Sequence, residues 1–517
     1  MNRYRISPIW VSTLCAAAAH GGARQPVLRI LPPPTVPAEI RQLQSAVKRR
    51  PSAFLYRRLA DRAATGGFHA IAAEAYEREA ALHRENGDPN AAVAEELKAG
   101  RHRTDARLFV LDTRFSAPVP PRARLEPEYG TLLGAFIDRD DQLRTVVSDE
   151  NSQTHRLPEE FEALTGKKHA SVFWYLKFGR PFPSRWVARL HRQGIIPHIA
   201  WEPRDLSEVT DSAYLARFAA AVRASGGPVF LRFAGEMNGA WTPYHGDPER
   251  YRAAFKTVST TIHRLAPNAA MIWCVNNAPD ATIDSYYPGD DAVDWVGVNF
   301  YNVLYAYNNP GRPADTLHPA DLLAPVYRRY AHRKPIAICE YAASQQSAVD
   351  GRQRPDYAAR RMRDLYTSLP RLFPRVKLVD WFDCNNLRHA GPTRQLNNYS
   401  LTENPAVLAA YRRAISSEHF LSGAQDRASY RIRPILQNET LRGPQRLTGW
   451  VRAPVAGARA YLFVGEQFLR EIEIPGDEEV EWAPSAGLRT APLRLVVVDA
   501  RGRLLGEQKL SVRLEPR

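Results

Sequence analysis

Cysteine is scarce in this chain, which excludes some ways of stabilising a fold. Only 4 of the 517 residues are cysteines, and one of them, Cys15, lies in an N-terminal apolar stretch that we expect to be removed. The others cannot form a fully paired disulfide framework, although Cys339 and Cys384 lie on neighbouring expected strands and could be bridged. No spacing of cysteine and histidine is typical of a zinc site. We expect no metal and no organic cofactor.

Three further features are missing, and each excludes a class of function. No apolar run is long enough to cross a membrane. No glycine-rich turn suited to phosphate follows an expected strand. No block of lysine or arginine accompanies the formal net charge of +15, so nucleic-acid binding is not expected. The dispersed positive charge indicates either a solvated, arginine-rich surface or attraction to an acidic polysaccharide.

The N-terminal segment has the pattern of an export signal. Arg3 and Arg5 precede a mostly apolar stretch at residues 6–19, which ends in alanines where a peptidase could cut. We therefore expect residues 1–24 to be a signal peptide and the mature protein to be secreted or periplasmic. The alternative is a tag-like start without a targeting role. Residues 25–37 are rich in proline and are expected to form a linker.

Two flanking parts differ in composition from the middle of the chain. Residues 37–112 are rich in alanine and have helical spacing, and they resemble the helical hairpins of tetratricopeptide repeats. Such an arm either packs on its neighbour or binds a protein partner. Residues 428–517 alternate apolar and polar positions between short turns, which predicts an immunoglobulin-like β-sandwich. This sandwich either binds carbohydrate through Trp450 and Trp482 or acts as a spacer.

The middle part, residues 125–420, alternates strand-like and helical segments. Its eight apolar, strand-like runs are residues 129–138, 169–179, 194–203, 227–236, 269–277, 293–301, 334–341 and 376–385. Amphipathic helical stretches lie between most of them. This rhythm predicts a (β/α)8 or TIM barrel, with a doubly wound open sheet as the alternative. In a barrel, a functional site is built at the carboxyl ends of the strands.

Two of these strands end in glutamate. Glu236 closes the fourth expected strand and Glu340 closes the seventh, and aromatic and amide residues follow each of them. In a closed barrel the two side chains would lie on facing walls of one opening. Paired carboxylates can cleave an acetal, one as proton donor and the other as nucleophile. Carboxyl groups about 5–5.5 Å apart would imply retention of configuration, and about 6.5–9.5 Å would imply inversion.

The segments around these glutamates resemble glycoside hydrolase family 26, which contains β-mannanases and β-glucanases of the retaining barrel clan. The resemblance extends over about residues 129–415 and is carried by residues 233–241, 268–276, 287–301 and 334–340. It implies that Glu236 is the general acid/base and that Glu340 is the nucleophile. One position departs from the family pattern, because histidine usually precedes the acid/base and this chain has Gly235. Mannan specificity is therefore not carried over.

Other residues at the strand ends predict a sugar cleft. Trp381 and Trp241 are expected to stack on pyranose rings. Arg232 and Tyr301 are expected to donate hydrogen bonds to the nucleophile. Asn238 would position either a sugar hydroxyl or a loop backbone. The complete set of substrate-binding candidates is Trp201, Glu202, Arg232, Asn238, Trp241, Tyr301, Trp381 and Asp383.

Two hypotheses of different class follow from these residues. The first is a secreted, retaining glycoside hydrolase that cleaves β-glycosidic bonds within an extracellular polysaccharide. The second is a catalytically weak or inactive carbohydrate-binding scaffold in exopolysaccharide synthesis or export. Gly235 favours the second hypothesis, whereas the presence of both Glu236 and Glu340 favours the first. Glu202 is expected to be either a third acid of the site or a charge at its rim.

Overall fold

The computed structural model describes residues 30–113, 123–476, 478–483 and 489–515, and the chain forms two compact units. One unit is Thr113–Arg431, and the other combines Met1–Asp112 with Ile432–Arg517. The expected signal peptide at residues 1–24 lies outside the described residues. No helix in the described ranges is long and apolar enough to cross a membrane.

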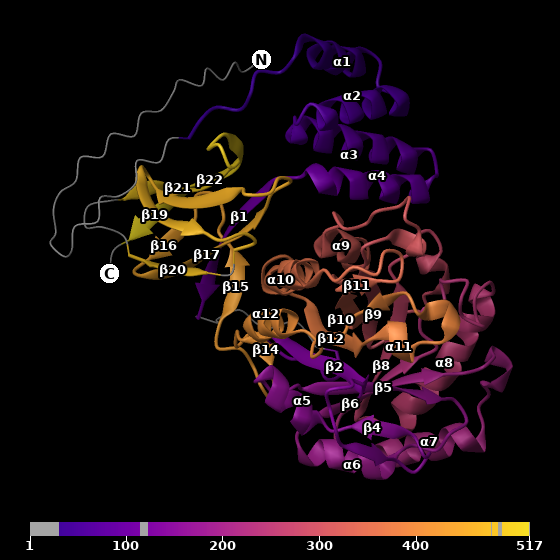
Figure 1. The fold of residues 1–517 in the computed structure, drawn as a ribbon. Coiled ribbons are helices and arrows are strands. Elements are labelled where there is room, and N and C mark those ends of the chain that lie inside the picture. Colours follow the sequence, from indigo (N-terminus) through magenta and orange to yellow (C-terminus); the bar gives the residue numbers. More distant parts are fainter. Residues whose placement is uncertain (1–29, 114–122, 477, 484–488, 516–517) are drawn as a thin grey trace. The chain divides into compact units, whose positions relative to one another are not determined.

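The first unit is a closed barrel of parallel strands (Figure 1). Its strands, in order of pairing, are β2 (Thr131–Arg139), β5 (Ser171–Lys177), β6 (Ile196–Glu202), β7 (Val229–Phe233), β8 (Ala269–Asn276), β9 (Trp295–Asn302), β10 (Ile336–Ala343) and β12 (Val376–Cys384). Pairing of β12 with β2 closes the ring, with Trp381 opposite Ala135. The predicted (β/α)8 barrel is thus confirmed, and the open sheet is excluded.

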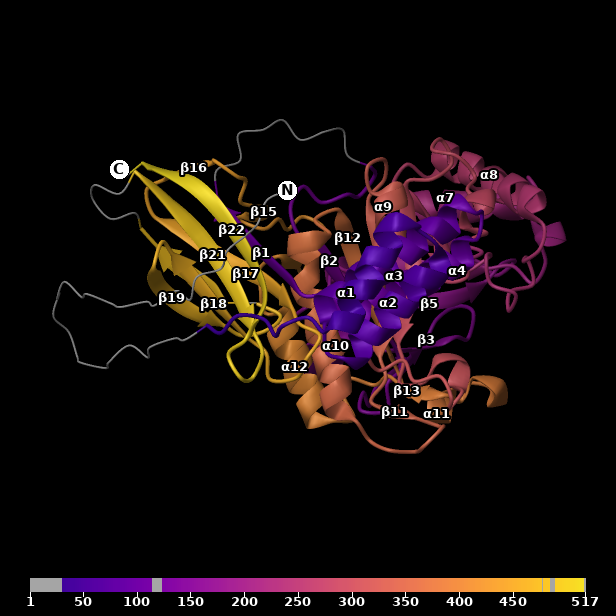
Figure 2. The ribbon, with the colours of Figure 1, turned by 90° about the horizontal axis from the view of Figure 1, so that it is seen from above.

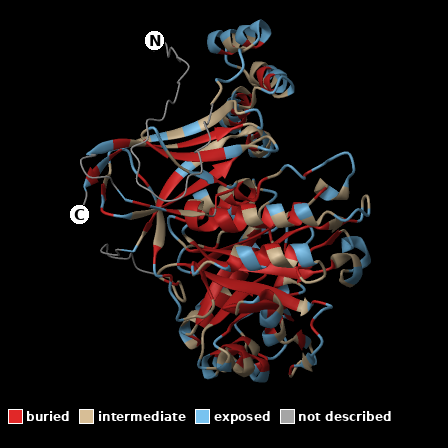
Figure 3. Ribbon diagram, turned by 60° about the vertical axis from the view of Figure 1, so that its left-hand side comes forward, coloured by how far each residue is buried: buried red, intermediate tan, exposed pale blue. Residues whose placement is uncertain are grey.

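Helices surround this barrel and follow most of its strands. They are α5 (Pro158–Thr165), α6 (Ser184–Arg192), α7 (Ala213–Ala224), α8 (Pro248–Leu265), α9 (Pro319–Tyr330), α10 (Pro355–Leu372) and α12 (Pro405–Ile415). Several begin at a side-chain cap: Ser212 accepts from the backbone N–H of Leu215, and Asp247 accepts from that of Arg250. Buried residues concentrate on the strands and on the helix faces that cover them (Figure 3).

The barrel interior is closely packed and includes buried thiols. Cys274 and Cys339 are fully buried in the same apolar cluster, and a Cβ atom added to Gly297 would lie 2.8 Å from both the Cβ of Cys274 and the Sγ of Cys339. Glycine at this position lets the two side chains meet across β9. Cys274, Cys339 and Cys384 are all free, so the bridge considered between Cys339 and Cys384 is not formed.

The second unit begins with a stack of antiparallel helices, visible in indigo and purple in Figure 1. They are α1 (Ala38–Arg49), α2 (Ala53–Thr65), α3 (His69–Glu85) and α4 (Pro89–His102). Small residues, such as Ala60, Ala63 and Ala72, are fully buried where the helices cross. The helices end at His102, and the strand β1 (Asp105–Asp112), within the range expected for the arm, pairs with the C-terminal sheet instead.

The C-terminal part consists of two sheets (Figure 2). One contains β15 (Arg431–Pro434), β1, β17 (Gln445–Arg452) and β20 (Glu479–Trp482); the other contains β16 (Thr440–Arg442), β22 (Leu504–Glu515), β21 (Thr490–Val498), β18 (Arg459–Val464) and β19 (Gln467–Ile472). Their apolar faces form one core. Trp450 and Trp482 are 2% and 8% exposed, so neither offers a face for stacking on a sugar.

Candidate active site

Glu236 and Glu340 belong to one hydrogen-bonded group at the carboxyl ends of the barrel strands. Asn299, on β9, donates to Oε1 of Glu236 at 3.0 Å. Arg232, on β7, donates to Oδ1 of Asn299 at 3.5 Å and forms an ion pair with Oε1 of Glu340 at 2.8 Å. The two glutamates are therefore linked through only two intervening side chains. The structure brings together the carboxylates that the sequence places 104 positions apart.

Glu340 is held by three donors. The hydroxyl of Tyr175 donates to Oε1 at 2.6 Å, the hydroxyl of Tyr301 donates to Oε2 at 2.5 Å, and the guanidinium of Arg232 lies 2.8 Å from Oε1. Donors and a positive charge favour the ionised form of a carboxyl group. Burial and the nearby charge of Glu340 raise the pKa of Tyr301 and of Tyr175, so both phenols keep the proton that they donate. Glu340 is thus held as a carboxylate in a fixed position.

Glu236 is more open to solvent and has different partners. The indole N–H of Trp241 donates to Oε2 at 2.6 Å, and the amide of Asn276 donates to Oε1 at 2.9 Å. Glu236 is of intermediate exposure and Trp241 beside it is 48% exposed, whereas Glu340 is only 6% exposed. One glutamate is therefore enclosed, and the other lies beside an exposed aromatic face. Carboxyl groups in such different surroundings are suited to different roles.

The backbone that carries Glu236 adopts an uncommon conformation. Strand β7 ends at Phe233, and the next residues include Ala234 with φ 46° and Glu236 with φ 60°. Left-handed backbone at a residue other than glycine costs about 1–3 kcal/mol and is frequent at functional sites. The N–H of Glu236 donates to the carbonyl of Cys274 on β8 at 2.8 Å, which holds this turn against the barrel. The strained turn directs the Glu236 side chain toward Asn276 and Asn299.

Asn238 holds the backbone of a loop. Its side chain is fully buried, and its amide donates to the carbonyls of Asn276 and Pro279 at 2.8 and 3.1 Å. Its oxygen accepts from the N–H of Asn276 at 2.9 Å. Of the two roles considered for Asn238, the structure shows the contact with backbone. This contact also positions Asn276, which contacts Glu236.

Trp381 and Trp201 do not lie where a sugar could stack on them. Trp381 is fully buried, its ring packs against Tyr341 and Tyr411, and its indole N–H donates to the carbonyl of Tyr399. Trp201 is also fully buried and stacks on Phe218 of α7 with ring centroids 4.0 Å apart. Both indoles pack against other side chains of the barrel, so neither has an exposed face for the expected stacking on a sugar. Trp241 is the exposed aromatic side chain beside Glu236.

Asp383 also differs from its expected role, because it lies beneath the loops of the barrel mouth. Its side chain is fully buried, and Oδ1 accepts from the N–H of Leu401 at 2.7 Å. Burial and the neighbouring Asp140 carboxyl raise the pKa of Asp383 well above its usual range. Asp140 also accepts from the hydroxyl of Thr402 at 2.8 Å. Asp383 therefore fixes loop backbone and has no free face for a ligand.

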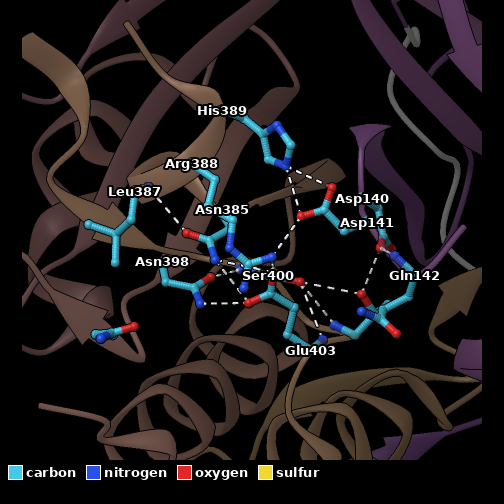
Figure 4. Close-up of polar contacts among 12 residues, drawn as sticks. Asp140, Asp141, Gln142, Asn385, Leu387, Arg388, His389, Asn398, Ser400 and Glu403 are labelled. Carbon is cyan, nitrogen blue, oxygen red and sulfur yellow. Dashed lines mark hydrogen bonds and ion pairs between the residues drawn. The ribbon is translucent and has the colours of Figure 1, made fainter. Parts of the chain in front are cut away.

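The polar contacts around these loops form a connected network (Figure 4). Glu403 accepts from the amides of Asn385 and Asn398 at 2.8–3.1 Å. Asp141, after β2, accepts from Arg388 and His389, after β12. These contacts tie the loops that follow the first and last barrel strands. They stiffen this wall of the mouth without placing a group on Glu236 or Glu340.

Glu202 is a third acid close to the pair. It ends β6, and one of its oxygens accepts a short hydrogen bond from the hydroxyl of Tyr244. Burial raises the pKa of Glu202 to about 7, although the charge of Arg232 and the Tyr244 hydrogen bond work in the opposite direction. Of the two roles considered for Glu202, this placement favours an acid of the site over a charge at the rim.

Three partners of the two glutamates were not among the residues singled out from the sequence: Tyr175, Asn276 and Asn299. Each lies near the carboxyl end of its strand, β5, β8 or β9. That position alone could have identified them, because strand ends form the site in a barrel. In the part of the chain that the structure describes, no cluster of three or more histidine, cysteine, aspartate or glutamate side chains could hold a metal ion.

A closed (β/α)8 barrel that presents two glutamates together at its carboxyl end is the arrangement of the barrel glycosidases. A model of glycosyl hydrolase family 26 matches residues 205–314 of the chain, a segment that contains Glu236 but not Glu340. The predicted resemblance to this family is thereby confirmed.

Two curated relatives and one solved structure are similar to parts of the chain. Endoglucanase H of Acetivibrio thermocellus is 26% identical over 283 residues, which are 50% of this chain and 29% of that protein. The β-1,3-xylanase TXYA of a Vibrio species is 32% identical over 105 residues, which are 19% of this chain and 22% of that protein. A modular endo-β-1,4-mannanase from Cellulomonas fimi covers 77% of this chain and 100% of its own, at 12% identity and a TM-score of 0.42, which is too low to support a conclusion. The chain matches less than a third of the length of either relative.

Proposed function

We propose that this protein is a retaining glycoside hydrolase that cleaves internal β-glycosidic bonds of a polysaccharide. The observation that carries the proposal is the group formed by Glu236, Asn299, Arg232 and Glu340. It joins an enclosed carboxylate with three donors to a more open carboxyl beside an exposed indole. The match to family 26 and the names of its relatives, an endoglucanase and a xylanase, support the same reaction class.

We infer a double displacement from the resemblance to the retaining enzymes of family 26. In the first step the Glu340 carboxylate attacks the anomeric carbon, while Glu236 gives its proton to the departing glycosidic oxygen. In the second step Glu236, now ionised, takes a proton from water, and that water attacks the anomeric carbon of the glycosyl ester on Glu340. Cleavage of the ester frees Glu340 and leaves Glu236 protonated, so the site is regenerated. Tyr175, Tyr301 and Arg232 keep Glu340 ionised and oriented between turnovers.

The first test is hydrolysis of a panel of β-linked polysaccharides, including β-glucans, β-xylans, β-mannans and a uronic-acid polymer. We expect one of them to be cut to oligosaccharides, with the β-anomer of the product formed first when the reaction is followed by NMR. Initial release of the α-anomer would contradict the retaining mechanism. Binding of a polymer without cleavage would favour the carbohydrate-binding scaffold instead. A steep fall in affinity with added salt would point to the acidic polymer.

Replacing Tyr175 with phenylalanine should lower kcat/KM by about ten- to a hundredfold. The change removes a hydrogen bond to a charged oxygen of Glu340, and such bonds contribute about 1.5–3 kcal/mol. Tyr214→Phe is the matched control, since its hydroxyl donates to the carbonyl of Arg180 outside this group. Steady-state rates on the best polysaccharide would test the expectation, and equal rates for wild type and Tyr175→Phe would contradict it.

Export and a protein partner also remain part of this proposal. Export would follow from the apolar segment at residues 6–19. The helical arm exposes Phe54, at 68%, on α2, which is compatible with a protein partner of that arm.

A further inference from the structure

The carboxyl group of Glu202 lies close to Gly235, the residue directly before the acid/base residue Glu236. Gly235 directly precedes Glu236, and its backbone is not in the left-handed region, so other residues could adopt its conformation. A Cβ atom added at Gly235 would lie 3.6 Å from Oε1 of Glu202 and 3.9 Å from the side chain of Arg232, both ordinary contact distances. A larger side chain at position 235 would therefore extend into the place that the Glu202 carboxyl occupies. Glu202 therefore occupies space that a side chain at position 235 would need.

The Glu202 carboxyl is held in place by a hydrogen bond, but no ion pair among the described residues balances its charge. The Tyr244 hydroxyl donates a hydrogen bond to it, and Tyr244 itself is only 6% exposed. Arg232 lies nearby, but its ion pair is with Glu340. Within the described ranges, no cation forms an ion pair with Glu202. An anchored acid with remaining acceptor capacity at a strand end is suited to receive a donor from a ligand.

We propose that Glu202 is a specificity-determining residue, whose carboxyl accepts a hydrogen bond from a hydroxyl of the sugar next to Glu236. Tyr244 is the positioning residue that holds this carboxyl in place. The proposal rests on the proposed glycosidase function, and it adds the group that selects the sugar at the site of attack. A carboxylate at this position accepts from sugar hydroxyls, so it favours sugars with a hydroxyl directed at Glu202 over those without one.

The groups around Glu202 make its charge sensitive to pH. It faces Arg232 on β7, Glu236 and Tyr244 on the following loop, and Tyr251 on α8. Burial raises its pKa to about 7, so the carboxyl becomes ionised as the pH rises through neutrality. An ionised acceptor binds a hydroxyl more strongly than a neutral one. The sugar contact should therefore strengthen from about pH 6 to about pH 8.

The first experiment compares wild type with Glu202→Gln, Glu202→Ala and Tyr244→Phe on the polysaccharide that wild type cleaves best. We expect Glu202→Ala to raise KM by about ten- to a hundredfold with a smaller change in kcat. In wild type KM should fall as the pH rises through about 7, and this dependence should be absent from Glu202→Gln. Tyr244→Phe should move the dependence to higher pH, because it removes a hydrogen bond that lowers the pKa of Glu202.

The second experiment tests whether positions 202 and 235 share one space. Gly235→His should raise KM, because the imidazole displaces the Glu202 carboxyl, and Glu202→Ala combined with Gly235→His should be no worse than either change alone. If the increases in KM from the two single changes multiplied in the double variant, the inference that positions 202 and 235 share one space would be overturned. Unchanged KM and pH dependence in a folded Glu202→Gln variant would overturn the role of Glu202, although wild type still cleaves the polymer. No cleavage by wild type would instead overturn the proposed function itself.

Discussion

Glu340→Gln should reduce turnover of the best polysaccharide by about three orders of magnitude or more. Glutamine has nearly the same shape, and its single amide oxygen can still accept from one of the two tyrosine hydroxyls, so the fold of the site should be retained. Its amide cannot form the glycosyl ester that the double displacement requires. Initial rates of reducing-end release measure the effect. Glu249→Gln, at the exposed start of α8, is the control that should leave the rate unchanged.

The same comparison separates the two glutamates by role. Glu236→Ala should also lose most of its activity on polysaccharide, because the departing sugar oxygen needs a proton. It should retain far more activity on an aryl β-glycoside whose leaving group departs without a proton. Glu340→Gln should be inactive on both substrates. If Glu340→Gln cleaved the aryl glycoside as well as Glu236→Ala did, the assignment of the nucleophile to Glu340 would be wrong.

The barrel and its glutamate pair could be predicted because both leave a local signal. Eight apolar segments alternate with helical ones, and Glu236 and Glu340 lie near the carboxyl ends of two of them. No such local signal in the sequence indicates the direction in which an individual side chain points, toward the barrel interior or toward the helices. Barrel strands are buried on both faces, so their sequences lack the alternation that would tell inside from outside. Trp381 and Trp201 were therefore indistinguishable from aromatics that line the site, although both pack outward.

Irregular strand pairing is a second reason why the directions of these side chains could not be predicted from the sequence. The register between β9 and β10 shifts between Ile338 and Glu340, and the pairing of β12 with β2 shifts between Phe382 and Cys384. A shift of one residue turns the following side chains to the other face, so counting by twos fails near the strand ends. Asp383 lies within such a shift. The pairing of β1 with β17 joins residues more than 300 positions apart, and no local pattern reports a partner at that distance.

Arg232→Met should destabilise the barrel by about 3–5 kcal/mol, which is the usual cost of leaving one member of a buried ion pair alone. Arg232 is 1% exposed, pairs with Glu340 at 2.8 Å, and lies over the rings of Phe173 and Tyr175 at 5.2 and 5.5 Å. Methionine fills much of the same volume, so the loss would come mainly from the uncompensated Glu340 carboxylate. Urea unfolding of the full chain at neutral pH would measure it.

A double variant separates the contribution of the ion pair to stability from the contribution of Arg232 packing against the aromatic rings. Removing both charges, in Arg232→Met with Glu340→Gln, leaves no unpaired ion in the barrel, so this variant should be more stable than Arg232→Met alone. If the two substitutions destabilised the protein additively, Arg232 would act through its contacts with the aromatic rings. The ion pair would then not be what places Glu340 as a carboxylate beside the acid/base.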